Sequence, residues 1–456
     1  MKLNELMFRE YDIRGIVDED INEEIAYLIG RGFGSNLAKL GKKITTVGYD
    51  NRLSSPWIEE KLVKGITESG VNVIRLGLVT SPMYYFASDH LNTKCGLMIT
   101  ASHNPKEYNG FKFSYNGLHN AYGKDVKDLY HTIINKEFTN GNGTYSNYDI
   151  KKDYIKLITN DLKINKKLKV VIDCGNGTTS IIAKEIFSTF DNIELISICD
   201  ESDGDFPNHH PDPSVESNLQ MLKDKVLETN ADIGLAFDGD GDRAGIVDEN
   251  GQMIDMDKYQ IIIWRDIYNK VTKKEALFDV KCSKALEDEL IKLNIKPNCY
   301  RTGNSYMKAK SVEGDYPLSG ELSGHIFFRD RFPGYDDGIY AGLRLVEILS
   351  NTDKKLSQLL DNINIYFSSK ELKLKIDDEK KELFVNKVKE YCENKNYKML
   401  TIDGVKVLFN DGWAMVRASN TGPNITYRDE GKTKERLQEI ENEFNDLLDK
   451  ISNEIN

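Results

Sequence analysis

A short loop near position 100 places a serine among small and polar residues. Residues 100–112 read TASHNPKEYNGFK, so Ser102 is followed directly by His103, Asn104 and a proline. A serine in this setting can be presented on a turn instead of being packed inside a helix. A purely structural interpretation, in which His103 and Asn104 cap a helix, stays open for this loop alone. No GxSxG elbow surrounds Ser102, so acyl-transfer chemistry is not indicated.

A second loop, FDGDGDR at 237–243, carries three aspartates separated by glycines. Asp238, Asp240 and Asp242 can converge on one hard cation, since oxygen ligands without Cys or His favour Mg²⁺, Mn²⁺ or Ca²⁺. An EF-hand is the rival, because Glu249 falls at loop position twelve. Position six of an EF-hand must be glycine, however, and here it is Arg243, while the flanking residues read as strands. A solvated acidic turn is the remaining alternative.

The third loop is GELSGH at 320–325. Glu321 and Ser323 can accept and donate hydrogen bonds to the vicinal hydroxyls of a ligand, and His325 can exchange a proton near neutral pH. One histidine in a loop is more often structural, so this hexapeptide is informative only beside the other loops.

The fourth loop, RASNTGPNITYRDE at 417–430, has the composition of an anion cradle. Arginine binds phosphate through a bidentate fork, and hydroxyl and amide groups can complete the shell. The candidate ligands are Arg417, Ser419, Asn420, Thr421 and Arg428. No P-loop or GxGxxG precedes them, so a nucleotide is not indicated. The alternative is a polar turn after a strand at Trp413–Arg417.

The elements that must position these loops are strands that alternate with helical stretches. Such alternation predicts parallel βαβ units, in which ligands bind beyond the carboxyl ends of the strands. Ser102 and Asp238 both follow a predicted strand directly. The predicted strands are Ile44–Val47, Val71–Leu76, Gly96–Thr100, Leu168–Ile172 and Ile233–Phe237.

Composition limits the class of protein. The chain has 456 residues, 39% hydrophobic and 29% charged, which predicts a folded protein of about three or four domains. A net charge of −12 disfavours binding to nucleic acid or to an anionic membrane. We see no signal peptide and no apolar run long enough to span a bilayer. Six scattered cysteines without a CxxC pair predict free thiols in a reducing cytoplasm.

Domain boundaries follow from polar segments and turns. The polar segment 135–149 reads as a linker or exposed loop, and a turn lies at Glu249–Gly251. A third break is expected between a helix ending near Asn364 and a strand-like Glu371–Ile376. We therefore predict domains at 1–149, 150–252, 253–364 and 365–456.

The tail beyond Lys432 has apolar residues at helical spacing. A terminal helix packed on the core is favoured over a coiled coil, because the stripe lasts barely two heptads. Its members are Leu437, Ile440, Phe444, Leu447, Leu448 and Ile451.

Taken together, the four loops resemble the α-D-phosphohexomutase superfamily, in its phosphomannomutase/phosphoglucomutase branch. The match runs from YDIRG at 11–15 to the last loop, and therefore over nearly the whole chain. The resemblance implies a four-domain α/β architecture, with three similar mixed α/β domains and a C-terminal α+β domain around a central cleft.

The resemblance also implies roles for individual residues. Ser102 would carry the phosphoryl group, with Lys112, His325 and Arg14 in the catalytic set. Mg²⁺ would be held by Ser102 and the three aspartates of the second loop. Substrate contacts are implied for Tyr11, Arg243, Lys281, Glu321, Ser323, Arg417, Ser419, Asn420, Thr421 and Arg428.

The implied reaction is reversible phosphoryl transfer between O1 and O6 of mannose or glucose phosphates. It would run through glucose 1,6-bisphosphate or mannose 1,6-bisphosphate in the cytoplasm, in a monomer or weak homodimer. A sugar phosphatase would not need the second phosphate cradle. A non-catalytic sensor would be expected to lose Ser102 or an aspartate, and none is lost. Phosphoglucosamine mutase is the rival within the family.

Two positions bear on the choice of sugar. Leu322 stands where phosphoglucosamine mutases tend to have glutamine, so an apolar residue points away from that branch. Asn304, in RTGNS at 301–305, stands where relatives of the branch usually carry a histidine thought to touch the substrate. Asparagine can still hydrogen-bond but cannot titrate, so the role of position 304 in sugar preference stays open.

Overall fold

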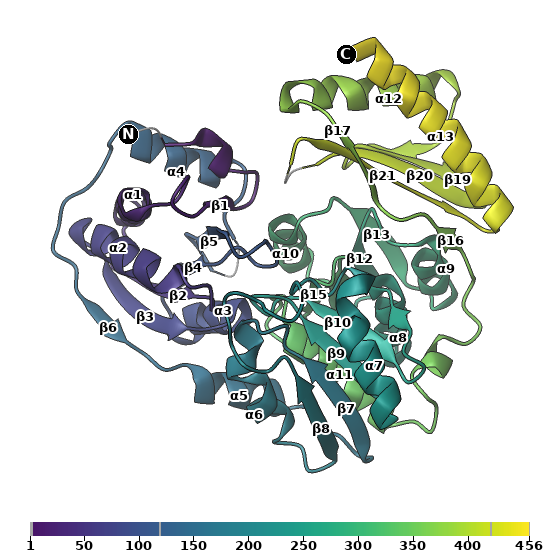
Figure 1. Ribbon diagram of the computed structural model, residues 1–456, viewed down its shortest axis with the longest axis horizontal. Helices are drawn as coiled ribbons and strands as arrows, with labels where there is room; N and C mark the ends of the chain where they lie inside the picture. Colours follow the sequence, from purple (N-terminus) through teal and green to yellow (C-terminus); the bar gives the residue numbers. More distant parts are fainter. Residues whose placement is uncertain (1–2, 118–119, 420–421, 456) are drawn as a thin grey trace.

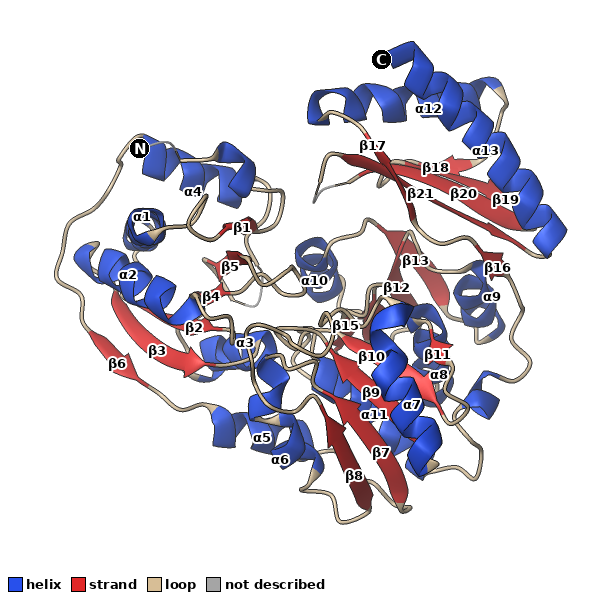
Figure 2. Ribbon diagram, viewed as in Figure 1, coloured by secondary structure: helices blue, strands red, loops and turns tan. Residues whose placement is uncertain are grey.

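The computed structural model describes residues 3–117, 120–419 and 422–455. Four β-sheets follow one another along the chain, each with its own helices (Figures 1 and 2). Within the described residues, no helix is both long enough and apolar enough to cross a membrane.

The first sheet has the strand order β1-β5-β4-β2-β3-β6. Part of the predicted linker at 135–149 is in fact its edge strand β6, which pairs in parallel with β3. The strands are β1 (Ile13–Ile16), β2 (Ile44–Tyr49), β3 (Asn72–Leu78), β4 (Gly96–Ile99), β5 (Tyr108–Ser114) and β6 (Tyr145–Asn147), and the helices are α1 (Glu23–Lys39), α2 (Ser55–Glu68), α3 (Ser81–His90) and α4 (Lys124–Ile134).

The second sheet has the order β11-β10-β9-β7-β8. Its strands are β7 (Leu168–Asp173), β8 (Ile193–Ile198), β9 (Ile233–Phe237), β10 (Ala244–Asp248) and β11 (Met253–Ile254), and its helices are α5 (Lys151–Thr159), α6 (Ala183–Phe187) and α7 (Gln220–Thr229). The aspartate loop joins strands β9 and β10, so strands flank it as predicted and the helices of an EF-hand do not.

The third sheet has the order β13-β12-β14-β15. The predicted helix end near Asn364 is wrong, because α11 ends at Ser350 and a 3₁₀ turn at Ser357–Leu360 follows. The elements are α8 (Met256–Ile267), β12 (Glu275–Asp279), α9 (Lys284–Lys292), β13 (Lys296–Tyr300), α10 (Asn304–Glu313), β14 (Leu318–Gly320), β15 (Ile326–Phe328) and α11 (Gly338–Ser350).

The fourth sheet is antiparallel, and two helices pack on it (Figure 2). The predicted terminal helix is confirmed as α13, whose apolar stripe is buried except for the half-buried Leu437. The elements are β16 (Phe367–Ser368), β17 (Leu372–Lys375), α12 (Lys381–Asn394), β18 (Met399–Leu400), β19 (Val405–Phe409), β20 (Gly412–Ala418), β21 (Asn424–Gly431) and α13 (Lys434–Ile455).

The first three sheets share one topological unit. The strand orders β5-β4-β2-β3, β10-β9-β7-β8 and β15-β14-β12-β13 are equivalent, and in each the first strand named is antiparallel to the second. The predicted parallel pairing is confirmed for β2 with β3 and β4 and for β7 with β9, while β5, β10 and β15 add one antiparallel neighbour to each unit. A short loop can join antiparallel neighbours directly, whereas parallel neighbours need a crossover. The three short loops are those with Ser102, with the aspartates and with GELSGH.

Core packing joins the first three sheets more closely than the fourth. One apolar cluster runs from Met83 and Tyr84 of α3 through the second sheet to helices α8 and α11. The fourth sheet has its own cluster with α12 and α13. The first three units therefore share buried surface that fixes their loops relative to one another.

Candidate active site

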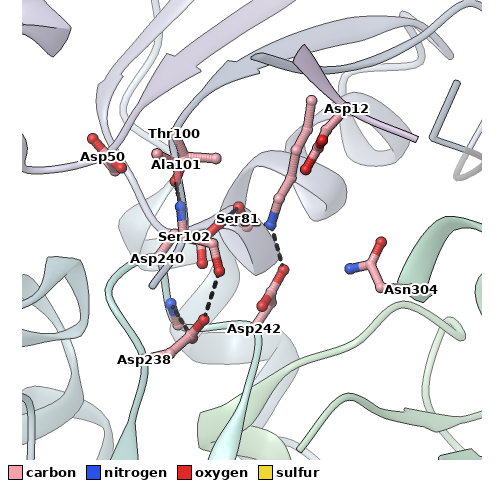
Figure 3. Close-up of polar contacts among 12 residues, drawn as sticks. Asp12, Asp50, Ser81, Thr100, Ala101, Ser102, Asp238, Asp240, Asp242 and Asn304 are labelled. Carbon is pink, nitrogen blue, oxygen red and sulfur yellow. Dashed lines mark hydrogen bonds and ion pairs between the residues drawn. The ribbon is translucent and has the colours of Figure 1, made fainter. Parts of the chain in front are cut away.

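Ser102 lies in the loop between β4 and β5 with its side chain buried. Its Oγ donates to Asp238 Oδ2 at 2.9 Å (Figure 3). The same Oγ lies 3.1 Å from His103 Nδ1. The φ angle of Ser102 is +52°, in the left-handed region that non-glycine residues rarely adopt. The strained turn presents the hydroxyl to the aspartate loop of the next sheet.

Arg52, just beyond the end of β2, stabilises this strained turn through hydrogen bonds to its backbone carbonyls. Its guanidinium donates to the carbonyls of Ser102 (2.9 Å), Asn104 (2.7 Å), Pro105 (2.7 Å) and Tyr108 (3.0 Å). Its Nε also donates to Asp50 at 3.2 Å, and Arg52 is only 1% exposed. The planar fork of arginine suits several fixed acceptors at once. Sequence reasoning missed Arg52, whose only signal is its place after a predicted strand.

Replacing Arg52 by methionine is expected to destabilise the protein. The substitution leaves Asp50 buried without its cation and four carbonyls without their donor, so we expect a loss of roughly 3–5 kcal/mol in the free energy of unfolding. Urea denaturation measures this loss. Lys106→Met, which removes only an exposed ion pair to Asp205, is the control and should stay within about 1 kcal/mol. Equal midpoints for the two variants would refute the assigned role of Arg52.

The three carboxylates of the aspartate loop are completely buried and lie beside Ser102 (Figure 3). Gly239 allows the approach, because a Cβ there would lie 2.4 Å from the Ser102 carbonyl oxygen. Ser81 donates to Asp240 at 2.6 Å. Lys112, which β5 contributes, pairs with Asp240 at 2.7 Å and with Asp242 at 2.6 Å. The structure thus brings the predicted nucleophile, the lysine and the three carboxylates into contact.

The carboxylates form a donor set that fits a hard cation. Ligand oxygens of Asp238, Asp240 and Asp242 lie within 4.8 Å of one another, and Oδ1 of Asp240 and of Asp242 is buried without a hydrogen-bond partner. Burial and the neighbouring carboxylates raise the pKa of Asp238. Burial also opposes ionisation of the other two, but the Lys112 ammonium holds their pKa values below the ordinary range. A site that has only oxygen ligands, excess negative charge and two carboxylate oxygens without hydrogen-bond donors suits Mg²⁺.

Arg14 on β1 also contacts the serine loop. Its Nε donates to Asp12 at 2.7 Å, and its Nη1 donates to Asn104 Oδ1 at 2.6 Å and to the Ala101 carbonyl at 3.3 Å. The guanidinium is buried beside Ser102, where it adds positive charge to the loop.

The GELSGH loop joins β14 and β15 and reaches the aspartate loop through its histidine. Arg243 Nε donates to His325 Nε2 at 2.9 Å, so this nitrogen carries a lone pair. His325 Nδ1 lies 2.8 Å from Asp336 and 3.4 Å from Asp242. Glu321 is buried and accepts from the Gly303 amide at 2.6 Å, while Ser323 is half-buried in the same loop. Burial raises the pKa of Glu321.

Asp336 is a buried carboxylate that contacts three side chains, and the sequence analysis did not identify it. Besides His325, it accepts from Asn304 Nδ2 at 2.6 Å and lies 3.0 Å from the Nζ of the fully buried Lys308. Burial alone would raise the pKa of Asp336, but Lys308 and His325 hold it below the ordinary range. Asn304, which stands opposite the aspartate loop in Figure 3, therefore supports the histidine through a shared carboxylate.

The fourth loop begins at the end of β20, on the separate C-terminal unit. Arg417 is buried, and its Nε donates to Asp403 at 3.0 Å. Asp403 also accepts from the Thr302 amide of the third unit at 3.0 Å, which connects this loop to the segment bearing Asn304. Ser419 is buried, and its carbonyl accepts from Lys381 at 2.8 Å. Asn420 and Thr421 lie outside the described residues.

Three further predicted residues lie at the edges of this constellation. The Arg428 guanidinium donates to the carbonyls of Lys281 and Ser369, at 3.1 and 3.3 Å. Lys281 Nζ lies 3.6 Å from Glu371. Tyr11 is half-buried, and burial followed by the charge of Asp12 raises its pKa to about 12.

The fold and the site together define a class of protein. Its members have three repeated α/β units and one α+β unit, and each unit contributes one polar loop to a shared site. Models of the four domains of phosphoglucomutase/phosphomannomutase match this chain in order. Domains I, II and III, described as alpha/beta/alpha, match residues 5–140, 152–251 and 255–366, and the C-terminal domain matches 371–447.

Individual relatives agree with these matches over almost their full length. A phosphomannomutase/phosphoglucomutase from Pseudomonas syringae is 39% identical over 450 residues, covering 99% of this chain and 96% of the relative. A phosphoglucomutase from Neisseria gonorrhoeae is 36% identical, covering 97% and 96%. The crystal structure of a phosphoglucomutase/phosphomannomutase family protein from Burkholderia thailandensis superposes with a TM-score of 0.93 at 35% identity, covering 100% and 99%. The chain belongs to the phosphoglucomutase/phosphomannomutase family, and the four-domain architecture expected from sequence is confirmed.

Proposed function

We propose that this chain is a hexose-phosphate mutase that interconverts the 1-phosphates and 6-phosphates of mannose and glucose. The observation that carries this proposal is the hydrogen bond from Ser102 Oγ to Asp238, inside a buried cluster of three carboxylates and Lys112. The cluster forms only because loops of two different domains meet. Full-length family membership supports the same activity.

The first half-reaction begins with a phosphoryl group on Ser102. The bond between phosphorus and Ser102 Oγ breaks, and a bond forms to the free hydroxyl oxygen of the bound hexose monophosphate. Asp238, Asp240, Asp242 and Ser102 would hold Mg²⁺, which neutralises charge on the phosphoryl oxygens when bound. Lys112 and Arg14 add positive charge beside the same oxygens.

The half-reaction moves one proton from the attacking sugar hydroxyl to Ser102 Oγ as the phosphoryl group departs, so no outside acid or base is consumed. We assign removal of that proton to His325, whose Nε2 is the unprotonated ring nitrogen: in the structure it accepts from Arg243, a contact that the sugar hydroxyl must replace before the transfer. Asp238 accepts the restored Ser102 hydroxyl, as it does in the structure.

The second half-reaction repeats the transfer with the sugar reversed. Glucose 1,6-bisphosphate or mannose 1,6-bisphosphate turns over in the site, and its other phosphate returns to Ser102. Arg417 and Ser419, with Asn420 and Thr421, hold whichever phosphate is not reacting, and Tyr11, Lys281 and Arg428 complete the surrounding contacts. Glu321 and Ser323 hold sugar hydroxyls whose positions roughly interchange. One set of residues therefore serves both halves.

The setting of the enzyme follows from the same reasoning. We propose domains at 1–149, 150–252, 253–364 and 365–456, a monomer or weak homodimer, and no membrane or nucleic-acid partner. All six cysteines are free, which suits a reducing cytoplasm.

The choice of sugar tests the proposed function directly. We propose that the GELSGH loop contacts the 3- and 4-hydroxyls of the sugar. Mannose 1-phosphate and glucose 1-phosphate, which differ only at the 2-hydroxyl, should then both turn over within about 10- to 100-fold of each other. Glucosamine 1-phosphate should be poorer, since no residue is assigned to its amine. We would measure kcat/KM for all three with glucose 1,6-bisphosphate as activator. A clear preference for glucosamine 1-phosphate would assign the chain to the phosphoglucosamine mutases, and release of inorganic phosphate would make it a phosphatase.

Arg417→Ala is expected to weaken binding of 1-phosphate and 6-phosphate substrates alike. Loss of a charge-assisted bidentate contact should cost roughly 2–4 kcal/mol in kcat/KM. The control is Arg436→Ala in the same domain, which removes partly exposed ion pairs to Asp411 and Glu439 and a contact with the Phe409 ring, all away from the proposed cradle. An effect confined to one reaction direction would contradict the shared phosphate cradle.

A further inference from the structure

A second group of metal-ligating side chains lies in the second domain, outside the site described above. Asp173 is the last residue of β7, and Cys199 directly follows β8, the parallel neighbour of β7. His209 comes from the long loop after β8. One ligand atom from each residue lies within 4.8 Å of the other two. The group sits beyond the carboxyl ends of two parallel strands, where ligands bind in open α/β sheets.

The orientation of His209 places a positive charge in this group. Its Nδ1 lies 3.1 Å from the carbonyl oxygen of His210, so this nitrogen is a donor. Its Nε2 faces both carboxylate oxygens of Asp173, at 3.0 and 3.2 Å. Two lone-pair-bearing groups cannot approach so closely unless a proton or a metal cation lies between them. The hydrogen bond to Asp173, followed by that to Cys199, raises the pKa of His209 to about 10, in line with this preference for positive charge.

The donor set indicates which cation would replace the proton. Sulfur, imidazole nitrogen and carboxylate oxygen together are typical of Zn²⁺ sites, whereas Mg²⁺ takes oxygen ligands. Metal-ligating histidines generally donate their second ring nitrogen to a carbonyl or carboxylate, which fixes the tautomer. His209 makes that bond to His210, and Asp173 Oδ1 is itself fixed by the Gly175 amide at 2.9 Å.

Access to the group is also suitable. Asp173 is fully buried, while Cys199 and His209 are partly exposed. Three protein ligands with an open side leave a fourth coordination position for water, as in zinc sites that are not fully closed. Cys199 is free and is not in a disulfide.

We propose that Asp173, Cys199 and His209 form a binding site for one thiophilic divalent cation, with Zn²⁺ as the preferred ion. This site is separate from the aspartate loop, which offers oxygen ligands only. Binding displaces the protons of the Cys199 thiol and of His209 Nε2 and leaves the Mg²⁺ ligands unchanged. It also fixes the loop that carries Pro211, whose side chain packs close to Gly175 and to Gly239 of the aspartate loop.

Cobalt(II) provides a spectroscopic test on the full-length protein. Co²⁺ is added to the protein in excess Mg²⁺, which fills the oxygen-only site. We expect a near-ultraviolet band of thiolate-to-cobalt charge transfer that saturates at one equivalent and disappears when Zn²⁺ is added. The Cys199→Ser variant should lack this band, and His209→Gln should weaken cobalt binding by at least tenfold. Cys299→Ser, which changes another partly buried free thiol, should keep the band unchanged.

Two results would overturn the proposal. One is the absence of a charge-transfer band from the wild-type protein at saturating Co²⁺, and the other is a band that persists in Cys199→Ser. Mutase activity measured in Mg²⁺ should be the same for Cys199→Ser and wild type, which shows that the variant is folded. The readout is metal binding, so it does not depend on the proposed mutase activity.

Discussion

Replacing Ser102 by alanine is expected to reduce turnover by several orders of magnitude while leaving the fold intact. Its hydroxyl lies on the strained loop between β4 and β5 and donates one hydrogen bond to Asp238, whereas Ser81, the other hydroxyl on the buried carboxylate cluster, donates to Asp240 from the first turn of α3. A serine hydroxyl that carries the phosphoryl group between half-reactions has no substitute in alanine. Steady-state kinetics with glucose 1-phosphate measures the loss.

The matched control for this substitution is Ser114→Ala. Ser114 is also a buried serine of the first sheet, but its hydroxyl donates only to the Gly117 carbonyl. It should keep nearly full activity. Intact-mass spectrometry should find a species heavier by one phosphoryl group in wild type and in Ser114→Ala, and none in Ser102→Ala. Near-wild-type turnover by Ser102→Ala would contradict the proposal that Ser102 carries the phosphoryl group.

Removal of the divalent cation is expected to have an effect of similar size. Asp238, Asp240 and Asp242 are fully buried and offer oxygen ligands only, so chelation should abolish activity and Mg²⁺ should restore it. Asp240→Asn should lower activity strongly, because it removes both a ligand charge and one of the two carboxylate partners of Lys112. The measurement is activity as a function of added Mg²⁺ after exhaustive chelation.

Glu249→Gln is the control for the metal experiment. Glu249 occupies the position that would ligate calcium in an EF-hand, but its carboxylate instead accepts from Ser357, with Oγ at 2.6 Å. The variant should keep the Mg²⁺ dependence of wild type. Full activity of the chelated wild-type protein, or a strict requirement for Zn²⁺, would contradict the assignment of the aspartate loop.

The residues that sequence could predict are those that form short motifs. Ser102, the three aspartates and His325 lie in loops directly after strands whose apolar runs are plain in the sequence. The first three sheets repeat one strand order, and in each sheet the loop of interest leads into an antiparallel strand. The structure brings the three equivalent loops together. Strands β5 and β15, which follow the Ser102 and GELSGH loops, were not among the predicted strands, and apolar runs do not encode the direction of pairing.

The residues that sequence missed act through tertiary contacts. Arg52 is one charged residue among many until β2 comes to lie beside β4, which places its guanidinium under the carbonyls of the serine loop. Asp336 and Lys308 form a buried pair whose partners come from separate segments. Arg428 was predicted as a phosphate ligand because arginine binds phosphate well. In the structure its guanidinium donates to the backbone carbonyls of Lys281 and Ser369, and the contact with Lys281 depends on how the fourth domain packs against the third.

Transfer of the phosphoryl group from Ser102 to the sugar is the central claim, and a single-turnover experiment tests it most directly. Wild-type protein carrying a radiolabelled phosphoryl group on Ser102 is mixed with excess glucose 1-phosphate, and the reaction is quenched at successive times. We expect the label to leave the protein and appear in glucose 1,6-bisphosphate at a rate at least equal to kcat, with little inorganic phosphate. Label that stays on Ser102 during many turnovers, or that appears as inorganic phosphate, would contradict the claim.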